Sequence, residues 1–203
     1  LKEVSAPYGY VLSHEAVKFD VTEENSTEES GVTIVAVKLG NYAQKGIIKI
    51  SKTGEVFASV TAADGVYQPV YTVQGLAGAT YEIKAAADIY TPDGTLRCSV
   101  GEVVDAVTTG ADGTAESKPL YLGKYEITEM KAPDGMVINK DAHTAELVYA
   151  GQEIEITETA ASFCNDRQKA RISLSKVLEQ NKQFGIGMNN ELSAVAFGFY
   201  AAE

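Results

Sequence analysis

The chain is poor in the residues and motifs that most enzymes use for acid–base, metal and cofactor chemistry. Its 203 residues include two histidines, His14 and His143, and neither belongs to an H-E-x-x-H motif. There is no G-x-S-x-G motif and no P-loop, and the G-x-G at residues 185–187 lacks the rest of a dinucleotide fingerprint. No EF-hand-like spacing of oxygen ligands is present. We therefore expect no enzyme with turnover, no cofactor and no metal site.

Positive charge is also scarce. The chain has 17 Lys and Arg against 28 Asp and Glu, for a formal net charge of -11. Nucleic acids and anionic membranes would repel such a surface, so neither is an expected partner. No apolar run is long enough to cross a bilayer, which predicts no membrane insertion for this part of the protein.

The two cysteines, Cys98 and Cys164, are too few for a disulfide scaffold. We expect them to be unpaired and to behave as small apolar side chains, with one disulfide between them as the alternative.

What the chain does contain favours β-structure. Hydrophobic residues make up 45% of it, and it has 18 glycines and 11 tyrosines but no tryptophan. No segment shows sustained helical periodicity. Turn signals occur at Asp64-Gly65, Pro92-Asp93-Gly94, Asp112-Gly113 and Asp134-Gly135. Strands are predicted over 47–52, 79–85, 124–129, 143–149 and 154–165, and the acidic stretch 22–30 is expected to form a solvated hairpin tip. Many short strands with regular turns predict an all-β, immunoglobulin-like sandwich.

Three markers recur along the chain at nearly one period. The pattern E-x-x-A-P-x-G starts at Glu3 and again 126 residues later at Glu129. The alternation that ends in Lys52 returns 124 residues later, ending in Lys176. Asparagines also close two apolar alternations 124 residues apart, Asn41 and Asn165.

This period predicts tandem domains. Residues 1–41 would be the closing half of one unit, 42–168 a complete unit, and 169–203 the opening strands of a third. The joints at 42–46 and 166–170 are short and lack Ser/Gly padding, which favours stiffly stacked modules. We expect the chain to be a piece of a longer repeat protein.

In the complete unit, three polar residues lie in phase with core-facing rows, because alternate side chains of a strand share a face. Ile48 and Ile50 lead to Lys52, Tyr125 and Ile127 lead to Glu129, and Phe163 leads to Asn165. Burying one charged side chain alone is costly, so we expect the three to meet.

Such a cluster is reactive as well as stable. Burial penalises charge, so the lysine and the glutamate are expected to share a proton as a neutral pair. A neutral Lys52 amine is a nucleophile, the side-chain carbonyl of Asn165 is an electrophile, and Glu129 can relay protons to the departing ammonia. The product would be a Lys52–Asn165 isopeptide bond, formed once. The alternatives are a buried but unreacted salt bridge, or side chains that simply reach solvent at strand ends.

The residues that carry this pattern resemble a known family. They are Ile50-Ser51-Lys52, the L-A-G-A-T-Y run at 76–81, the G-x-Y-x-x-x-E-x-x-A-P-x-G stretch at 123–135, and Phe163-Cys164-Asn165. Together they are similar to Cna B-type (SpaA-type pilin) domains of Gram-positive surface proteins, and the stretch at 123–135 resembles the pilin E-box.

The resemblance implies a prealbumin-like β-sandwich that builds pilus shafts or adhesin stalks on the cell wall, outside the cell. It implies that Lys52 and Asn165 are the bond partners and that Glu129 is the catalytic acid. In the partial units, Glu3 with Asn41, and Lys176, would fill the same roles. The expected partners are neighbouring repeats and a host or cell-surface ligand.

The sequence departs from that pattern at two places. Met136 stands where the family usually has tyrosine, which Tyr10 keeps in the first copy, and the stretch 53–75 is longer than the usual first loop. No LPxTG-type signal or clear pilin-motif lysine is present, so a pilus subunit and a large non-pilus surface protein fit equally well.

The main functional alternative is a ligand-binding adhesive domain on the same scaffold. Tyr67, Tyr71, Tyr90 and Tyr121 would then form a sugar- or protein-binding surface. The competing interpretation is that these tyrosines are ordinary strand residues.

Overall fold

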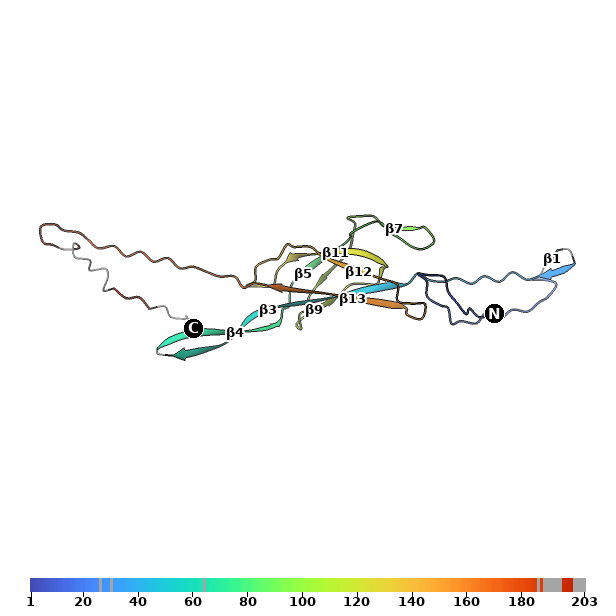
Figure 1. Cartoon of the computed structure of the whole chain (residues 1–203), viewed down its shortest axis with the longest axis horizontal. Helices are drawn as coiled ribbons and strands as arrows, with labels where there is room; N and C mark the ends of the chain where they lie inside the picture. Colours follow the sequence, from blue (N-terminus) through green and yellow to red (C-terminus); the bar gives the residue numbers. More distant parts are fainter. Residues whose placement is uncertain (26, 30, 64, 186, 188–194, 199–203) are drawn as a thin grey trace. The chain divides into compact units, whose positions relative to one another are not determined.

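The computed structural model describes all residues except 26, 30, 64, 186, 188–194 and 199–203, and the described part is built from strands and turns without a helix. The chain divides into two compact units, Leu1–Gln168 and Lys169–Glu203. All thirteen described strands lie in the first unit (Figure 1).

The first large sheet is organised around the long strand β3 (Lys45–Ala63). It pairs in parallel with β13 (Ile156–Asn165) and antiparallel with β4 (Val66–Gly75), β9 (Thr114–Glu116) and β10 (Leu120–Tyr121). Figure 1 shows β3 and β13 side by side through the middle of this unit. The first and last strands of the predicted complete unit are therefore direct neighbours.

The second large sheet is antiparallel throughout. Its order is β12 (His143–Leu147), β11 (Gly123–Lys131), β5 (Thr80–Ala85) and β8 (Val103–Thr108). Two short hairpins stand apart from the large sheets. One joins β1 (Thr27–Glu29) to β2 (Val32–Ile34), and the other joins β6 (Ile89–Tyr90) to β7 (Leu96–Cys98). The first of these includes the end of the acidic stretch 22–30, for which a hairpin was predicted.

The core lies between the two large sheets. Along β3, side chains alternate between buried and partly exposed from Lys45 to Gly54, as expected for a strand with one face against a core. The buried apolar cluster draws on both layers: Ile48, Ile50, Ala161, Phe163 and Leu120 from one sheet, and Ala79, Tyr81, Ile83, Ala85, Tyr125, Ile127, Ala145 and Leu147 from the other. The predicted all-β sandwich is confirmed.

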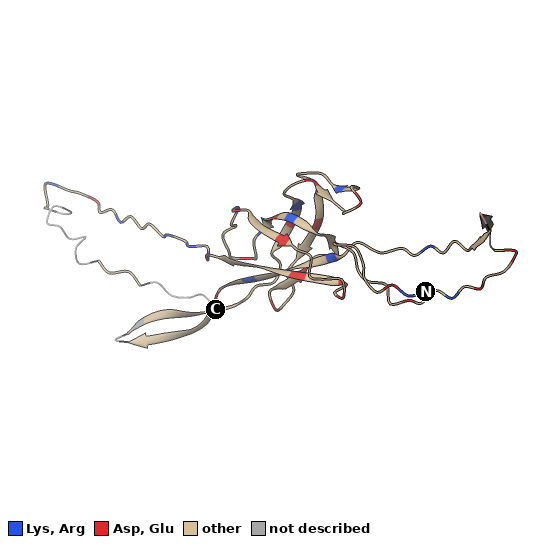
Figure 2. Ribbon diagram, turned by 45° about the vertical axis from the view of Figure 1, so that its right-hand side comes forward, with Lys and Arg blue, Asp and Glu red and all other residues tan. Residues whose placement is uncertain are grey.

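The five strands predicted from sequence are all present, and four of them differ only slightly at their ends, whereas the strand predicted over 47–52 is much longer. The stretch 53–75, treated as a long loop, is instead a hairpin in which β3 continues to Ala63 and pairs with β4. Both faces of this hairpin are open to solvent, as Phe57 at 60% and Tyr67 at 74% exposure show, so no buried-face alternation marks it in the sequence. It is also free of charged side chains over most of its length, and is drawn as the plain tan hairpin in Figure 2.

Cys98 and Cys164 are both free thiols; Cys98 is partly buried, whereas Cys164 is exposed and does not pack as an apolar core side chain. Among the described residues, no helix has the length and apolar character needed to cross a membrane.

Candidate functional site

Three strands bring the predicted site residues together. Lys52 lies on β3, Asn165 ends β13, and Glu129 lies on β11 in the opposite sheet. In the parallel β3–β13 pair, Lys52 is level with Phe163 and Gly54 is level with Asn165. Because residues two apart on a strand point the same way, Lys52 and Asn165 both face the core and reach toward Glu129 across it.

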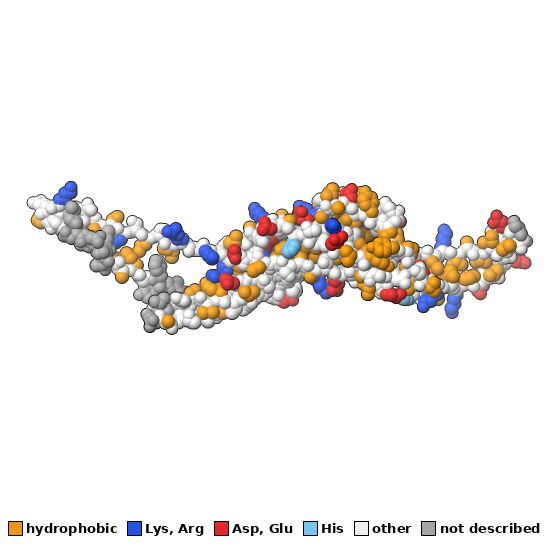
Figure 3. All heavy atoms as spheres, viewed as in Figure 1, with side chains coloured by type: hydrophobic (Ala, Val, Ile, Leu, Met, Phe, Trp, Pro, Cys, Tyr) orange, Lys and Arg blue, Asp and Glu red, His pale blue; other side chains and the backbone are white. Residues whose placement is uncertain are grey.

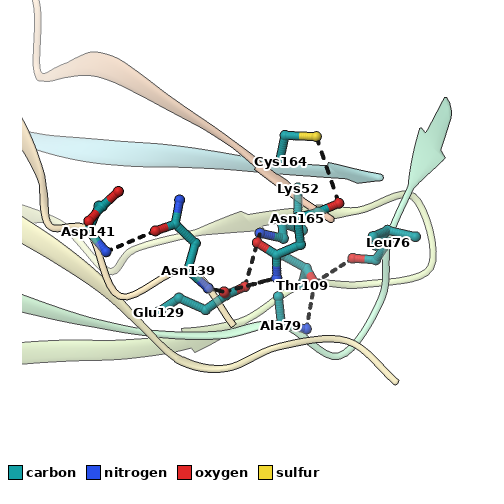
Figure 4. A network of polar contacts seen from close by, with 9 residues as sticks. All are labelled: Lys52, Leu76, Ala79, Thr109, Glu129, Asn139, Asp141, Cys164 and Asn165. Carbon is teal, nitrogen blue, oxygen red and sulfur yellow. Dashed lines mark hydrogen bonds and ion pairs between the residues drawn. The ribbon is translucent and has the colours of Figure 1, made fainter. Parts of the chain in front are cut away.

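The side chains of Lys52, Glu129 and Asn165 form a closed triangle of polar contacts (Figure 4). The Lys52 Nζ atom lies 3.0 Å from Glu129 Oε1 and donates a hydrogen bond to Asn165 Oδ1. The Asn165 Nδ2 atom donates to both carboxyl oxygens of Glu129, at 3.0 Å to Oε1 and 2.9 Å to Oε2. The amine therefore touches the carbonyl side of the amide, while the acid touches both the amine and the amide nitrogen.

This triangle is excluded from solvent. The side chains of Lys52 and Glu129 are 0% and 1% exposed, and Asn165 is 3% exposed. Aromatic rings form part of the wall, with Lys52 Nζ 5.9 Å from the Tyr81 ring centroid and 6.0 Å from that of Phe163. In so dry a setting, polar interactions are strong and an unpaired charge is very costly.

Glu129 is positioned by its strand and by the loop that follows it. The β11–β5 register shifts between Glu129 and Lys131, so a β-bulge lies directly after the acid. Bulges often re-aim side chains next to functional sites. The backbone N–H of Asn139 donates to Glu129 Oε2 at 2.8 Å, which fixes the second carboxyl oxygen. Asn139 could not be identified from the sequence, because its contribution comes from the backbone and leaves no side-chain signal.

Tyr81 is a further residue that the sequence analysis did not assign to the site. It pairs with Glu129 across β5 and β11, and its ring is fully buried. Its hydroxyl is buried and has no hydrogen-bond partner among the described residues. Burial, and secondarily the nearby Glu129 carboxyl, raise the pKa of Tyr81, so the phenol stays protonated beside the cluster.

The backbone at Lys52 is held by two turns. The Lys52 N–H donates to the carbonyl of Gly113 at 2.7 Å, and the Lys52 carbonyl accepts from the N–H of Leu76 at 2.9 Å. Thr109 Oγ1 then donates to the carbonyl of Leu76 at 2.7 Å, which ties the end of β8 to the same point (Figure 4). Gly113 adopts φ +79°, and a Cβ there would lie 2.4 Å from the Lys52 carbonyl oxygen, so only glycine fits this approach.

The predicted counterparts in the partial units are placed as follows. Glu3 and Asn41 are brought together, with Asn41 Nδ2 donating to Glu3 Oε1 at 2.9 Å and to Oε2 at 2.7 Å. Ser13 N–H donates to Glu3 Oε2 at 2.8 Å. Lys176 lies in the second compact unit, where it is exposed and has no ion-pair partner in the described part of the chain.

The four tyrosines proposed as a binding surface do not form one set. Tyr67 and Tyr71 lie on β4, and the Arg167 guanidinium lies 3.5 Å from the Tyr71 ring centroid. Tyr90 and Tyr121 instead line a pocket of about 270 Å³ together with other residues, including Tyr8 and Tyr149. No group of three or more metal-ligating side chains occurs within the described residues.

The fold and the cluster define a class of module: a two-layer β-sandwich whose first and last core strands meet at a buried Lys–Glu–Asn triangle. Residues 70–160 match the family model of the SpaA prealbumin-like fold domain. The match includes Glu129, and it leaves Lys52 and Asn165 outside its limits. Over residues 70–160 the chain is therefore similar to SpaA-type domains of prealbumin-like fold.

Three individual proteins illustrate the similarity. The trypsin-resistant surface T6 protein of Streptococcus pyogenes is 34% identical over 71 residues, which is 34% of this chain and 13% of that protein. The Bacillus anthracis TIE protein is 24% identical with a TM-score of 0.43, covering 82% of this chain and 24% of that one. A minor pilin of Streptococcus agalactiae is 15% identical with a TM-score of 0.41, covering 66% and 49%. The chain thus spans well under two thirds of the length of these relatives.

Proposed function

We propose that residues 42–168 are a load-bearing stalk module of a Gram-positive surface protein, closed by an isopeptide bond between Lys52 and Asn165. The observation that carries this proposal is the buried triangle, in which one amine contacts an amide carbonyl and an acid at once. The cluster is placed for one reaction between neighbouring strands, and not for binding and releasing a substrate.

The reaction proceeds from the observed contacts. Lys52 passes a proton to Glu129 across their 3.0 Å contact and becomes a neutral amine. Its Nζ, which contacts Oδ1, attacks the side-chain Cγ of Asn165, while the protonated acid lies against Nδ2 of the same amide. Glu129 then relays protons to Nδ2, the Cγ–Nδ2 bond breaks, and ammonia leaves. One amide replaces another, so the reaction requires no oxidant, metal or cofactor.

The position of the bond decides its mechanical effect. Force applied through the ends of the unit enters β3 and leaves through β13, which are adjacent parallel strands. A covalent tie from Lys52 to Asn165 carries that force directly and shields the 112 residues between them. In the chain-entropy model, a cross-link that closes a loop of this length stabilises a domain by about 5 kcal/mol.

Contacts at the start of this unit fit a stiff stalk. Val11 N–H donates to the carbonyl of Tyr42 at 2.9 Å, and Gln44 N–H donates to the carbonyl of Gly9 at 2.8 Å. The Tyr8 and Tyr149 rings pack 4.6 Å apart between centroids. We infer that residues 1–41, 42–168 and 169–203 belong to successive repeats, that neighbouring repeats are the principal partners, and that the protein is exposed on the cell wall, as the surface location named for the T6 relative suggests.

Single-molecule stretching of the chain tests the load-bearing role. With the bond in place, residues 53–164 should contribute no extension at any force that leaves covalent bonds intact. Lys52→Ala should restore an unfolding step whose added length is close to about 3.5 Å for each released residue. A wild-type chain that shows this same long step would contradict the proposal.

The tyrosine-lined pocket favours adhesion as a second candidate function. Tyr8, Tyr90, Tyr121 and Tyr149 offer amphipathic rings around a space of about 270 Å³, a chemistry suited to a sugar or a peptide segment. Binding to a glycan or host-protein array that is lost in Tyr90→Ala would support this role. Equal signals from wild type and variant would exclude this pocket as the site.

A further inference from the structure

We propose that residues 42–168 carry a socket for the Ala-Pro-x-Gly turn of the repeat before them, and that Gln152 and Gln44 hold the turn in it. On this chain the occupant is the turn at residues 6–9. This inference rests on the proposed division into successive repeats, and it adds the residues that would fix one repeat against the next.

The Ala-Pro-x-Gly turn is the part of the E-x-x-A-P-x-G pattern that the proposed bond does not use, since that chemistry needs only the glutamate. The turn has the same shape in both copies. Tyr10 N–H donates to the carbonyl of Pro7, and Met136 N–H donates to that of Pro133, at 3.1 Å each. A recurring turn of fixed shape outside the reacting cluster indicates a role of its own.

The first copy of the turn is held by Gln152, in the loop between β12 and β13. The backbone N–H of Ala6 donates to Gln152 Oε1 at 2.8 Å. The N–H of Leu12, just past the turn, donates to the backbone carbonyl of Gln152 at 2.9 Å. One residue of the complete unit therefore satisfies a backbone donor on each side of the turn.

Gln44 holds the same loop in place from the inside. Its side chain is buried, with the residue 1% exposed. The Nε2 atom donates to the carbonyls of Gly151, at 2.9 Å, and Ile154, while Oε1 accepts from the N–H of Ala150 at 2.9 Å. An amide supplies both the donors and the acceptor that these contacts need. Gln44 also reaches the turn itself, because its backbone N–H donates to the carbonyl of Gly9 at 2.8 Å.

A further wall of the socket is Pro92, in the turn of the β6–β7 hairpin. Gly9 is buried with φ +84°, and a Cβ there would lie 2.5 Å from Pro92 Cγ. Hydrophobic side chains gather on the surface around this hairpin (Figure 3), where Tyr90 and Leu96 are 56% and 47% exposed. This close approach admits glycine and excludes a side chain, which accounts for the glycine of the turn in this copy.

Together these contacts fix the direction in which one repeat follows another. Domains joined by a linker move relative to each other unless their interface restrains them. Here the turn is held at separate points, by Gln152, by Gln44 and against Pro92, so it cannot rotate without breaking several contacts at once. The docked turn, and not the short joint alone, then makes the stalk stiff.

Amide hydrogen exchange, followed by NMR on the 203-residue chain, tests the socket. In the wild type, the Ala6 and Leu12 amides should exchange slowly. Gln152→Ala removes the acceptor of Ala6, whose exchange should become about tenfold faster. Gln152→Glu keeps an acceptor oxygen and should leave Ala6 protected. Gln68→Ala, at an exposed glutamine of β4, is the matched control and should change neither amide.

The same change of amide to carboxylate should have the opposite effect at Gln44. Gln44→Glu replaces two donors with a carboxylate that faces two backbone carbonyls, so the loop should shift and Ala6 and Leu12 should both lose protection. The Ile48 amide, which donates to a buried hydroxyl, reports whether the sandwich is still folded. If Ile48 also loses protection, the two Gln152 variants decide the test.

Residual dipolar couplings measured on the same samples test the orientation. In the wild type, the couplings of residues 6–12 should fit the alignment of residues 42–168, and in Gln152→Ala they should become smaller. An Ala6 amide that exchanges freely in the wild type, or exchange and couplings that Gln152→Ala leaves unchanged, would overturn the socket.

The isopeptide bond is measured separately from the socket. The intact mass reports on Lys52 and Asn165, whereas the exchange of Ala6 reports on the joint. A chain of full mass with a protected Ala6 would keep the socket and lose the proposed bond, and a chain with the mass deficit and an unprotected Ala6 would do the reverse.

Discussion

At the scale of the residue, Lys52, Glu129 and Asn165 depend on one another for their burial. Each has polar atoms that would be unsatisfied in the core if the other two were apolar. Removing one member of such a buried pair usually costs about 3–5 kcal/mol, because the remaining charge stays in a dry environment. The isopeptide bond would remove the buried lysine charge, since the product amide carries none.

Replacing the acid tests its part in the chemistry. Glu129→Gln keeps the shape of the side chain but removes the proton relay, so the chain should retain its full mass. It should also lose at least about 4 kcal/mol of unfolding free energy, through the missing cross-link and the unpaired lysine. Glu126→Gln, on the same strand but exposed, is the matched control and should change neither. A Glu129→Gln chain that still loses ammonia would show that the acid is dispensable.

Tyr81 allows a finer test beside the same cluster. Its hydroxyl has no hydrogen-bond partner among the described residues, so Tyr81→Phe removes a buried polar group without breaking a bond. We expect the isopeptide bond to form as before and the melting temperature to stay the same or rise slightly, as mass spectrometry and calorimetry would show. A marked slowing of bond formation would instead assign the phenol a part in the reaction.

At this scale, the period-2 phase of three strands was enough to locate Lys52, Glu129 and Asn165. The same reasoning could not find Asn139, because a backbone N–H carries no residue signature. It also gave Tyr81 no role in the site, because nothing in a sequence distinguishes a buried ring beside a carboxyl from one beside other apolar side chains.

At the scale of the element, the turn at Gly113 joins β8 to β9 and supports the backbone of Lys52. Any larger residue at this position would destabilise the fold in two ways. It would have to adopt the φ of +79°, and its Cβ would lie 2.4 Å from the Lys52 carbonyl oxygen. Gly94 has the same φ of +79° with no atom within 4 Å of its Cβ position. The pair therefore separates backbone conformation from steric contact.

We expect Gly94→Ala to cost about 1 kcal/mol from the left-handed backbone alone. Gly113→Ala should cost at least about 2 kcal/mol more, because the clash is with backbone and cannot be relieved by a rotamer change. It should also slow bond formation by displacing Lys52. Chemical denaturation of both variants provides the comparison, and equal destabilisation would mean that the turn yields without disturbing β3.

Strands with one buried face were predicted well, because apolar and polar residues alternate along such a strand. The strands β4, β6, β7, β8, β9 and β10 were not predicted. Several of them are only two or three residues long, and the outer part of the β3–β4 hairpin has no buried face. Their pairing depends on contacts with neighbouring strands, and local sequence periodicity carries no information about those contacts.

At the scale of the whole molecule, two buried tyrosines link stability to alkaline pH. Burial raises the pKa of both Tyr81 and Tyr125, with smaller contributions from Glu129 and Cys98 respectively. In an unfolded chain a tyrosine has a pKa of about 10. Above that value the unfolded state binds fewer protons than the folded one, so the free energy of unfolding should fall as pH rises.

Thermal melts at increasing pH above about 10 should therefore show a declining midpoint, with a shallower decline in Tyr81→Phe. Ultraviolet titration of the folded chain should leave two of the 11 tyrosines protonated until unfolding. Ionisation of all 11 in a chain that is still folded would contradict the buried environment described for these rings.

In the proposed stalk module, the first and last core strands of residues 42–168 are joined covalently. The most direct measurement is the intact mass of the fully denatured chain, followed by peptide mapping. We expect a deficit of one ammonia, about 17 Da, located in a peptide pair linked through Lys52 and Asn165. The full calculated mass, with Lys52 and Asn165 recovered in separate unmodified peptides, would show that the triangle is an unreacted polar cluster and that no isopeptide bond forms.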